Sequence, residues 1–230
     1  MDKIIEWNDE MEQLLEKYFL EEYESVSGSK KIFHEDFDSP EISPYLKCIN
    51  PPADYAQETK FSCLSVRPQE STDFWKTVSK KYSSDSGHFL YADIKGDFTL
   101  KAGIRMNPLH RYDQSGLMVR ISETCWIKAG YEHDSGGDGG FMVTAANGKY
   151  SDWSRSEMNN YKDFVLKITR EGNLYTVEYL NKNNIWSTVR MAHLTDDDMV
   201  SPVKCGIYAA CPEEKGMSVS FDYVTISRLK

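Results

Sequence analysis

The chain has 230 residues, 40% hydrophobic and 13% aromatic, which is enough to bury a substantial core and argues against disorder. Its net charge of −9 excludes proteins that bind nucleic acid through a basic surface, because no excess of lysine and arginine neutralises phosphates. No apolar run approaches the roughly 18 residues of a membrane span, and the acidic N-terminus has no leader pattern. We expect a cytoplasmic protein without nucleic-acid or membrane partners.

Residues 1–30 are predicted to form an acidic amphipathic helix, mainly over 3–22, followed by a linker. They carry nine acidic and three basic residues. The apolar residues that recur at alternating spacings of three and four are Ile4, Trp7, Met11, Leu14 and Tyr18. This stripe docks either on the chain's own domain or on a protein partner or second copy.

From residue 31 onward the pattern becomes that of β-strands. Residues 89–106 give two alternating runs broken at 95–97, which predicts a hairpin. Residues 164–180 predict another, with Phe164, Leu166 and Ile168 facing inward. About ten to twelve such runs without helical segments between them indicate an antiparallel sandwich or jelly roll.

Several stretches of this region match one family. They are STDFW (71–75), GDFTL (96–100), YDQSGLMVR (112–120), CWIKAGYE (125–132), YSDWS (150–154), CGIYAACP (205–212) and VSFDYVTI (219–226). Over roughly residues 33–229 the chain resembles the regulation-of-enolase-like domain of unknown function family 1349. The resemblance implies an all-β, concanavalin-A-like (laminarinase-like) jelly roll and no settled activity. We therefore expect this sandwich over residues 31–230, with the helix of residues 1–30 added to it.

The strand over residues 125–132 has two chemically different faces. With a period of two, Ile127, Ala129 and Tyr131 face the core, and Trp126, Lys128 and Glu132 lie opposite. An aromatic ring, a cation and a carboxylate in one row suit a ligand groove on a concave sheet. The alternative is a salt bridge between Lys128 and Glu132 on a plain outer face, with Trp126 as a platform for the N-terminal segment.

Neighbouring strands add residues to the same groove. Gln114 lies opposite the inward Leu117, Val119 and Ile121 of its strand, and Tyr208 lies opposite its inward neighbours. Glycines at 116 and 130 are interpreted as leaving room for a ligand against the sheet.

Trp153 is predicted to stack on a sugar ring. Asp152 then bonds sugar hydroxyls or, alternatively, caps a turn. We place Trp75 in the core. The acidic, glycine-rich residues 133–140 fail the EF-hand calcium pattern and are predicted to be a hairpin loop.

The sequence suggests no metal and no cofactor. The odd set of cysteines contains no CxxC pair, and no two histidines have the i, i+4 spacing of a zinc helix. Nucleotide fingerprints and a GxSxG elbow are also absent. The cysteines, expected to be reduced and mostly buried, are Cys48, Cys63, Cys125, Cys205 and Cys211.

The favoured function is a non-catalytic binding module for a carbohydrate-like or small polar ligand, and the name of the family suggests regulation of a metabolic enzyme. The ligand residues are Gln114, Trp126, Lys128, Glu132, Trp153 and Tyr208, with no catalytic residue among them. The alternative is a glycoside-active enzyme of laminarinase-like fold. It is disfavoured because the groove offers only Glu132, which beside Lys128 is expected to stay ionised.

Overall fold

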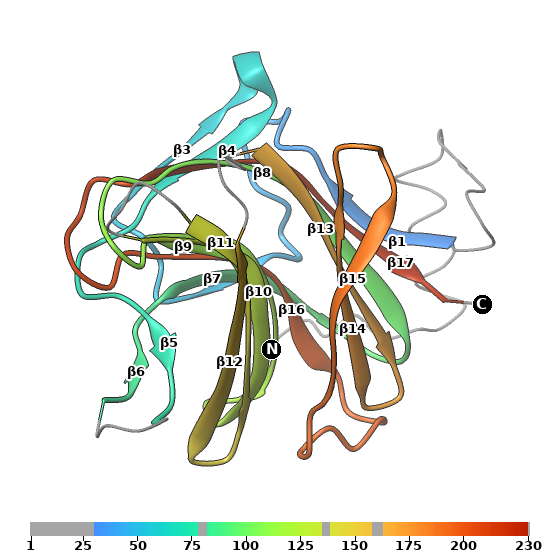
Figure 1. The fold of residues 1–230 in the computed structure, drawn as a ribbon. Coiled ribbons are helices and arrows are strands. Elements are labelled where there is room, and N and C mark those ends of the chain that lie inside the picture. Colours follow the sequence, from blue (N-terminus) through green and yellow to red (C-terminus); the bar gives the residue numbers. More distant parts are fainter. Residues whose placement is uncertain (1–29, 78–81, 135–138, 158–162, 230) are drawn as a thin grey trace.

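The computed structural model describes residues 30–77, 82–134, 139–157 and 163–229, an antiparallel sandwich of two large sheets (Figure 1). The predicted N-terminal helix lies outside these residues, so its docking stays a prediction. The strands are β1 (Lys30–Glu35), β2 (Lys47–Ile49), β3 (Asp54–Glu58), β4 (Cys63–Arg67), β5 (Phe74–Trp75), β6 (Ser84–Asp85), β7 (His88–Ile94), β8 (Phe98–Asn107), β9 (Gln114–Ser122), β10 (Cys125–His133), β11 (Gly139–Asn147), β12 (Tyr150–Glu157), β13 (Asp163–Glu171), β14 (Leu174–Leu180), β15 (Trp186–His193), β16 (Val203–Ala210) and β17 (Ser218–Arg228). A 3-10 helix, η1 (Thr59–Phe61), joins β3 to β4.

The two sheets divide the strands between them. The seven-stranded sheet has the order β12-β11-β10-β9-β16-β7-β2. The eight-stranded sheet has the order β15-β14-β13-β8-β17-β4-β3, and β1 also pairs with β17. Among the residues described, no helix has the length and apolar character that a membrane crossing requires. The all-β antiparallel sandwich predicted from the sequence is confirmed.

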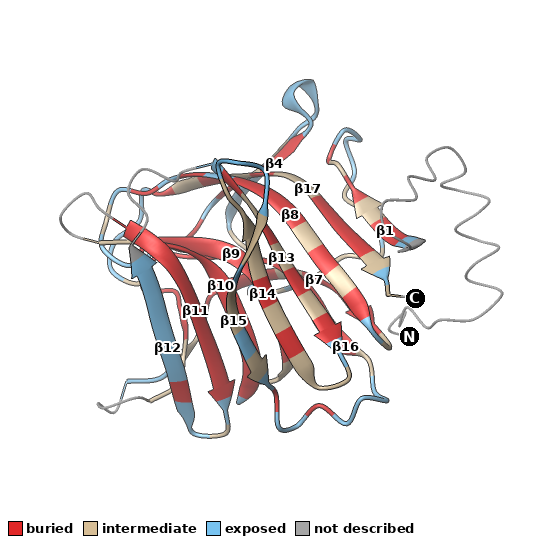
Figure 2. Cartoon of the chain, turned by 45° about the vertical axis from the view of Figure 1, so that its right-hand side comes forward, coloured by how far each residue is buried: buried red, intermediate tan, exposed pale blue. Residues whose placement is uncertain are grey.

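The alternation of apolar and polar residues correctly predicts which face of these strands points into the core. On β13, Phe164, Leu166 and Ile168 are buried in the core between the sheets, and the residues between them are more exposed. On β10, Ile127 and Tyr131 enter the same core. Figure 2 shows β9, β10 and β11 buried almost throughout, whereas the edge strand β12 is largely exposed.

The hairpin predicted over residues 89–106 is wrong. Strand β7 pairs with β16 and β2 in the seven-stranded sheet, and β8 pairs with β13 and β17 in the other. The turn at Gly96, whose φ of 80° suits glycine, therefore carries the chain from one sheet to the other. Alternation and a turn residue predict two strands but do not fix which partner each strand takes.

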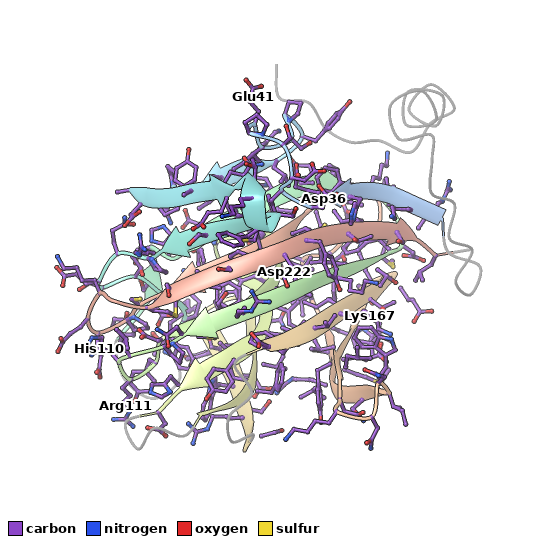
Figure 3. All side chains as sticks on the ribbon, turned by 90° about the horizontal axis from the view of Figure 1, so that it is seen from above. Asp36, Glu41, His110, Arg111, Lys167 and Asp222 are labelled. Atoms are coloured by element: carbon purple, nitrogen blue, oxygen red, sulfur yellow. The ribbon has the colours of Figure 1, made fainter. Side chains whose placement is uncertain are left out.

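The outer faces of the two sheets differ in their cover. Lys167 and Asp222 lie on the outer face of the eight-stranded sheet (Figure 3), where Lys167 pairs with Glu178 at 2.7 Å. On the outer face of the seven-stranded sheet, Lys128 and Glu132 are instead buried. Burial of charged side chains on an outer face requires a further layer of chain, and this layer builds the candidate site.

Candidate functional site

A segment that we call the strap crosses the outer face of the seven-stranded sheet. Its described residues are 69–77 and 82–88. Near one end, the Thr72 amide donates to the Cys211 carbonyl (3.1 Å), and the Cys211 amide donates to the Thr72 hydroxyl (2.9 Å). Toward β12, the Lys76 amide donates to the Ser151 hydroxyl (2.9 Å). In Figure 1 the strap strands β5 and β6 lie on the side of this sheet away from the other sheet.

Side chains fix the strap to the sheet between these attachments. The Arg120 guanidinium donates to both carboxylate oxygens of Asp85, at 2.5 and 2.8 Å. The fully buried Phe74 ring packs edge-on against Phe89 and Tyr208, with ring centres 6.5 and 6.4 Å away. A bidentate ion pair and a buried aromatic cluster make the strap part of the folded domain.

Lys128 is the centre of a buried polar triangle beneath the strap. Its ammonium group donates to Gln114 Oε1 (2.7 Å) and to Asp73 Oδ1 (3.1 Å), and Gln114 Nε2 donates to the same Asp73 oxygen (3.3 Å). The lysine is 1% exposed. It therefore takes its ion pair from the strap, and the predicted salt bridge with Glu132 is not the one that forms.

Glu132 lies in the same buried region, with 5% of its surface exposed. Burial raises the pKa of Glu132 to about 7, although nearby Lys128 and Arg155 lower it and Asp73 and Asp134 raise it further. Burial therefore outweighs the lowering effect of Lys128, and near pH 7 the carboxyl group is only partly ionised, whereas the sequence led us to expect an ionised carboxylate. Within the described part of the chain, no hydrogen bond reaches the Glu132 carboxyl group.

Tyr208 contributes a second buried group whose bonding is incomplete. Its side chain is 1% exposed, and its hydroxyl has no hydrogen-bond partner among the described residues. Burial raises the pKa of Tyr208 well above its usual range, and the nearby carboxylates of Glu132 and Asp73 raise it further. The neutral hydroxyl can therefore donate one hydrogen bond and accept others.

The strand glycines have a different role from the one predicted. A Cβ on Gly130 would overlap the carbonyl oxygen of Ser115, and a Cβ on Gly116 would overlap that of Ala129. The glycines therefore let β9 and β10 approach each other closely. The sequence analysis interpreted them as leaving room for a ligand, and the structure does not support that interpretation.

Gly130→Ala should lower the free energy of unfolding by about 1–3 kcal/mol, because the new methyl group meets rigid backbone. The control is Gly103→Ala, where the atoms nearest to the methyl group belong to the Tyr223 side chain and not to backbone. Urea titration of both variants checks this expectation. An equal, small effect of the two substitutions would mean that β9 and β10 can separate at no cost.

The structure brings most of the predicted site residues together. Gln114, Lys128 and Glu132 share the outer face with Tyr208. Trp126 lies beside them, its ring centre 5.8 Å from the Lys128 nitrogen, but it is fully buried and presents no exposed stacking surface.

Trp153 stands apart from this group. Lys128 pairs with Thr144 on the next strand, and Thr144 pairs with Trp153 on the strand after that. Trp153 therefore lies on the same face as Lys128 but two strands away, roughly 10 Å between the strands, and it is 40% exposed. Asp152 beside it pairs with Arg190 at 2.5 Å instead of capping a turn. Trp75, predicted in the core, is half-buried on the strap, and its neighbour Phe74 takes the buried position.

Asp73 is the main site residue that sequence reasoning missed. Its carboxylate is 55 residues from Lys128 along the chain, so no local spacing reveals the pair. The one available signal was its position in STDFW, a stretch that carries the family resemblance. Within the described ranges no three histidine, cysteine or acidic side chains gather to hold a metal ion, and part of the predicted 133–140 loop lies outside those ranges.

Known proteins resemble this domain in fold, and some of them also in sequence. A functionally unknown protein from Saccharomyces cerevisiae superposes with a TM-score of 0.73 at 30% identity, covering 81% of this chain and 97% of that one. Xylan beta-1,4-xylosidase from Bacillus halodurans C-125 gives 0.67 at 14% identity, over 90% of this chain but 40% of the xylosidase, which shows likeness of fold alone.

Sequence comparison gives the family. Regulation of enolase protein 1 of Saccharomyces cerevisiae is 33% identical over 178 residues, or 75% of this chain and 84% of the yeast protein. The family model described as "Protein of unknown function (DUF1349)" matches residues 48–229. These matches confirm the resemblance seen in the sequence, and the chain belongs to the DUF1349 family.

Proposed function

We propose that the outer face of the seven-stranded sheet, beneath the strap, binds a small hydroxyl-bearing ligand of carbohydrate type. The observation that carries this proposal is the buried Tyr208 hydroxyl, which lacks a hydrogen-bond partner among the described residues, on the same face as the Glu132 carboxyl group. A buried polar group without a partner costs about 1–3 kcal/mol. Ligand hydroxyls, which both donate and accept, would satisfy both groups.

The surroundings of these groups suit a sugar. The aromatic rings of Phe74, Phe89, Tyr91 and Trp126 cluster with Tyr208 on this face. Apolar rings beside a few convergent polar groups are typical of small-ligand sites. Asp73 and Phe74 cover the face, so entry of a ligand larger than water would require these strap residues to move.

The proposal also covers the fold family, the cellular location and the regulatory role of the protein. We assign the sandwich to the concanavalin-A-like jelly rolls and the protein to the cytosol, as a non-catalytic module. The yeast relative is named for the regulation of enolase, which supports a role in regulating a metabolic enzyme. Xylose-based saccharides are the first ligands to test, a choice taken from the name of the xylosidase, which resembles this chain in fold alone.

Tyr208→Phe tests the site with the smallest change, because it removes one oxygen that has no partner among the described residues. We expect the variant to fold at least as stably as the wild type, because the substitution removes an unpaired buried oxygen. Its affinity for the saccharide that the wild type binds should fall about three- to tenfold, the value of one neutral hydrogen bond. Calorimetric titration with xylose, xylobiose, xylotriose and glucose measures both proteins.

The matched control is Tyr55→Phe, at an exposed tyrosine on β3. It should bind the saccharide as the wild type does. If none of the four saccharides binds, or if Tyr208→Phe binds as tightly as the control, the proposed site is wrong.

Glycoside hydrolysis is the second candidate, favoured by the second carboxylate that the strap supplies. Asp73 is paired with a lysine, whereas the pKa of Glu132 is raised to about 7 by burial. A carboxylate paired with a cation, beside a second carboxyl group whose pKa is raised, is a combination also found in glycosidase active sites. Release of nitrophenol from nitrophenyl β-xyloside by the wild type, lost in Glu132→Gln, would replace the binding role with this one.

A further inference from the structure

A second hollow lies between the two sheets; it shares Phe89 and Tyr208 with the face beneath the strap, but not Lys128, Glu132 or Asp73. It is a cavity of about 280 Å³ at the edge of the sandwich where β2 and β3 are the outermost strands. Leu64 and Val66 of β4 line it from one sheet, and Leu90 and Ile207 line it from the other. Pro51, Tyr55 and Cys48 also line it.

The walls of this cavity offer no charge. No lysine, arginine, aspartate or glutamate of the described chain lines it. Its histidine, His88, uses both ring nitrogens within the protein: Nδ1 donates to the Asn50 carbonyl (2.6 Å), and Nε2 accepts from the Gln69 amide (3.2 Å). Burial lowers the pKa of His88, so its ring is neutral near pH 7.

The Cys48 thiol donates to the carbonyl of Ile49 (3.6 Å), and so it too has a partner within the chain. A charged ligand would therefore find no side chain of opposite charge in the described lining. An apolar occupant would instead gain from contact with the aliphatic and proline walls.

The volume decides what kind of molecule fits. A cavity of roughly 150 Å³ holds benzene, and this one is about twice as large. It is too small for a helix, which is about 10 Å across with its side chains. We propose that this cavity is a second binding site, for a small uncharged apolar molecule of the size of two fused aromatic rings or a short alkyl chain.

Cys48 provides a direct readout of occupancy. It is an exposed thiol that lines the cavity, whereas the other four cysteines are buried, so a thiol reagent such as dithionitrobenzoate reports on Cys48 in the folded full-length protein. Saturating naphthalene should slow this reaction by roughly fivefold or more, because the bound rings cover the thiol. Calorimetric titration with naphthalene should show one site per chain.

Ala209→Leu tests the location of binding, because Ala209 lines the cavity and a larger side chain fills it. The variant should lose naphthalene binding and the protection of Cys48. The matched control is Ala56→Leu, at an exposed position on β3 outside the lining, which should bind naphthalene normally. If Ala209→Leu fails to fold, Cys48→Phe at the cavity wall replaces it, with calorimetry as the readout.

Glu132→Gln separates this site from the one beneath the strap. Glu132 does not line the cavity, so the variant should bind naphthalene as the wild type does even though it alters the other site. Failure of naphthalene to bind, or binding that survives both cavity variants, would overturn the proposal.

Discussion

Glu132→Gln should raise the free energy of unfolding by about 3 kcal/mol at about pH 8 and leave it nearly unchanged at about pH 4. In the folded protein the Glu132 carboxyl keeps its proton up to about pH 7, whereas its unfolded value is 4.5. Between these values the folded state holds more protons than the unfolded state, so wild-type stability falls as the pH rises. The amide has no proton to lose and escapes this penalty.

Urea unfolding of wild type and variant from about pH 4 to pH 8 measures the difference. The control is Glu213→Gln, at an exposed residue, for which we expect little change in the difference between the two pH values. A constant difference between wild type and Glu132→Gln across this range would show that the carboxyl group ionises as it does in water.

Lys128→Met should lower the free energy of unfolding by about 3–5 kcal/mol, because it leaves the Asp73 carboxylate buried without its cation. Only the 3.3 Å hydrogen bond from Gln114 would then remain to the Asp73 oxygen that the lysine contacts. The double variant with Asp73→Asn should recover most of the loss, because it removes the stranded charge as well.

A thermodynamic cycle of the two single variants and the double variant measures this coupling. The control is Lys101→Met on the eight-stranded sheet, where the lysine lies 5.7 Å from the Tyr223 ring centre and only partly buried. A small cost for Lys128→Met, or a double variant as unstable as the sum of the single ones, would contradict the buried ion pair.

Period-two alternation predicts the faces of the strands well because a strand has no other way to separate core from surface. It places Ile127 and Tyr131 in the core and Lys128 and Glu132 on the opposite face, as observed. The pattern cannot say that this opposite face is covered. The cover comes from the strap, whose strands β5 and β6 have two residues each and are too short to give a period.

The chemistry of the face depends on the same long-range contact. Read locally, Lys128 and Glu132 look like partners, and their spacing suggests a charged pair that stays ionised. The strap places Asp73 within hydrogen-bond distance of Lys128, and burial raises the pKa of Glu132 by more than the nearby Lys128 lowers it. The glycine at 130 is similarly ambiguous in the sequence, because close strand approach and space for a ligand both favour glycine.

The most direct test of the saccharide site is a carboxyl-carbon NMR titration of Glu132 in the full-length protein, with and without the saccharide that calorimetry identifies. The proposed site predicts a pKa of about 7 in the free protein and a different value once a ligand hydroxyl bonds to the carboxyl group. A pKa near 4.5 in the free protein, or a value that saturating saccharide leaves unchanged, would contradict the account.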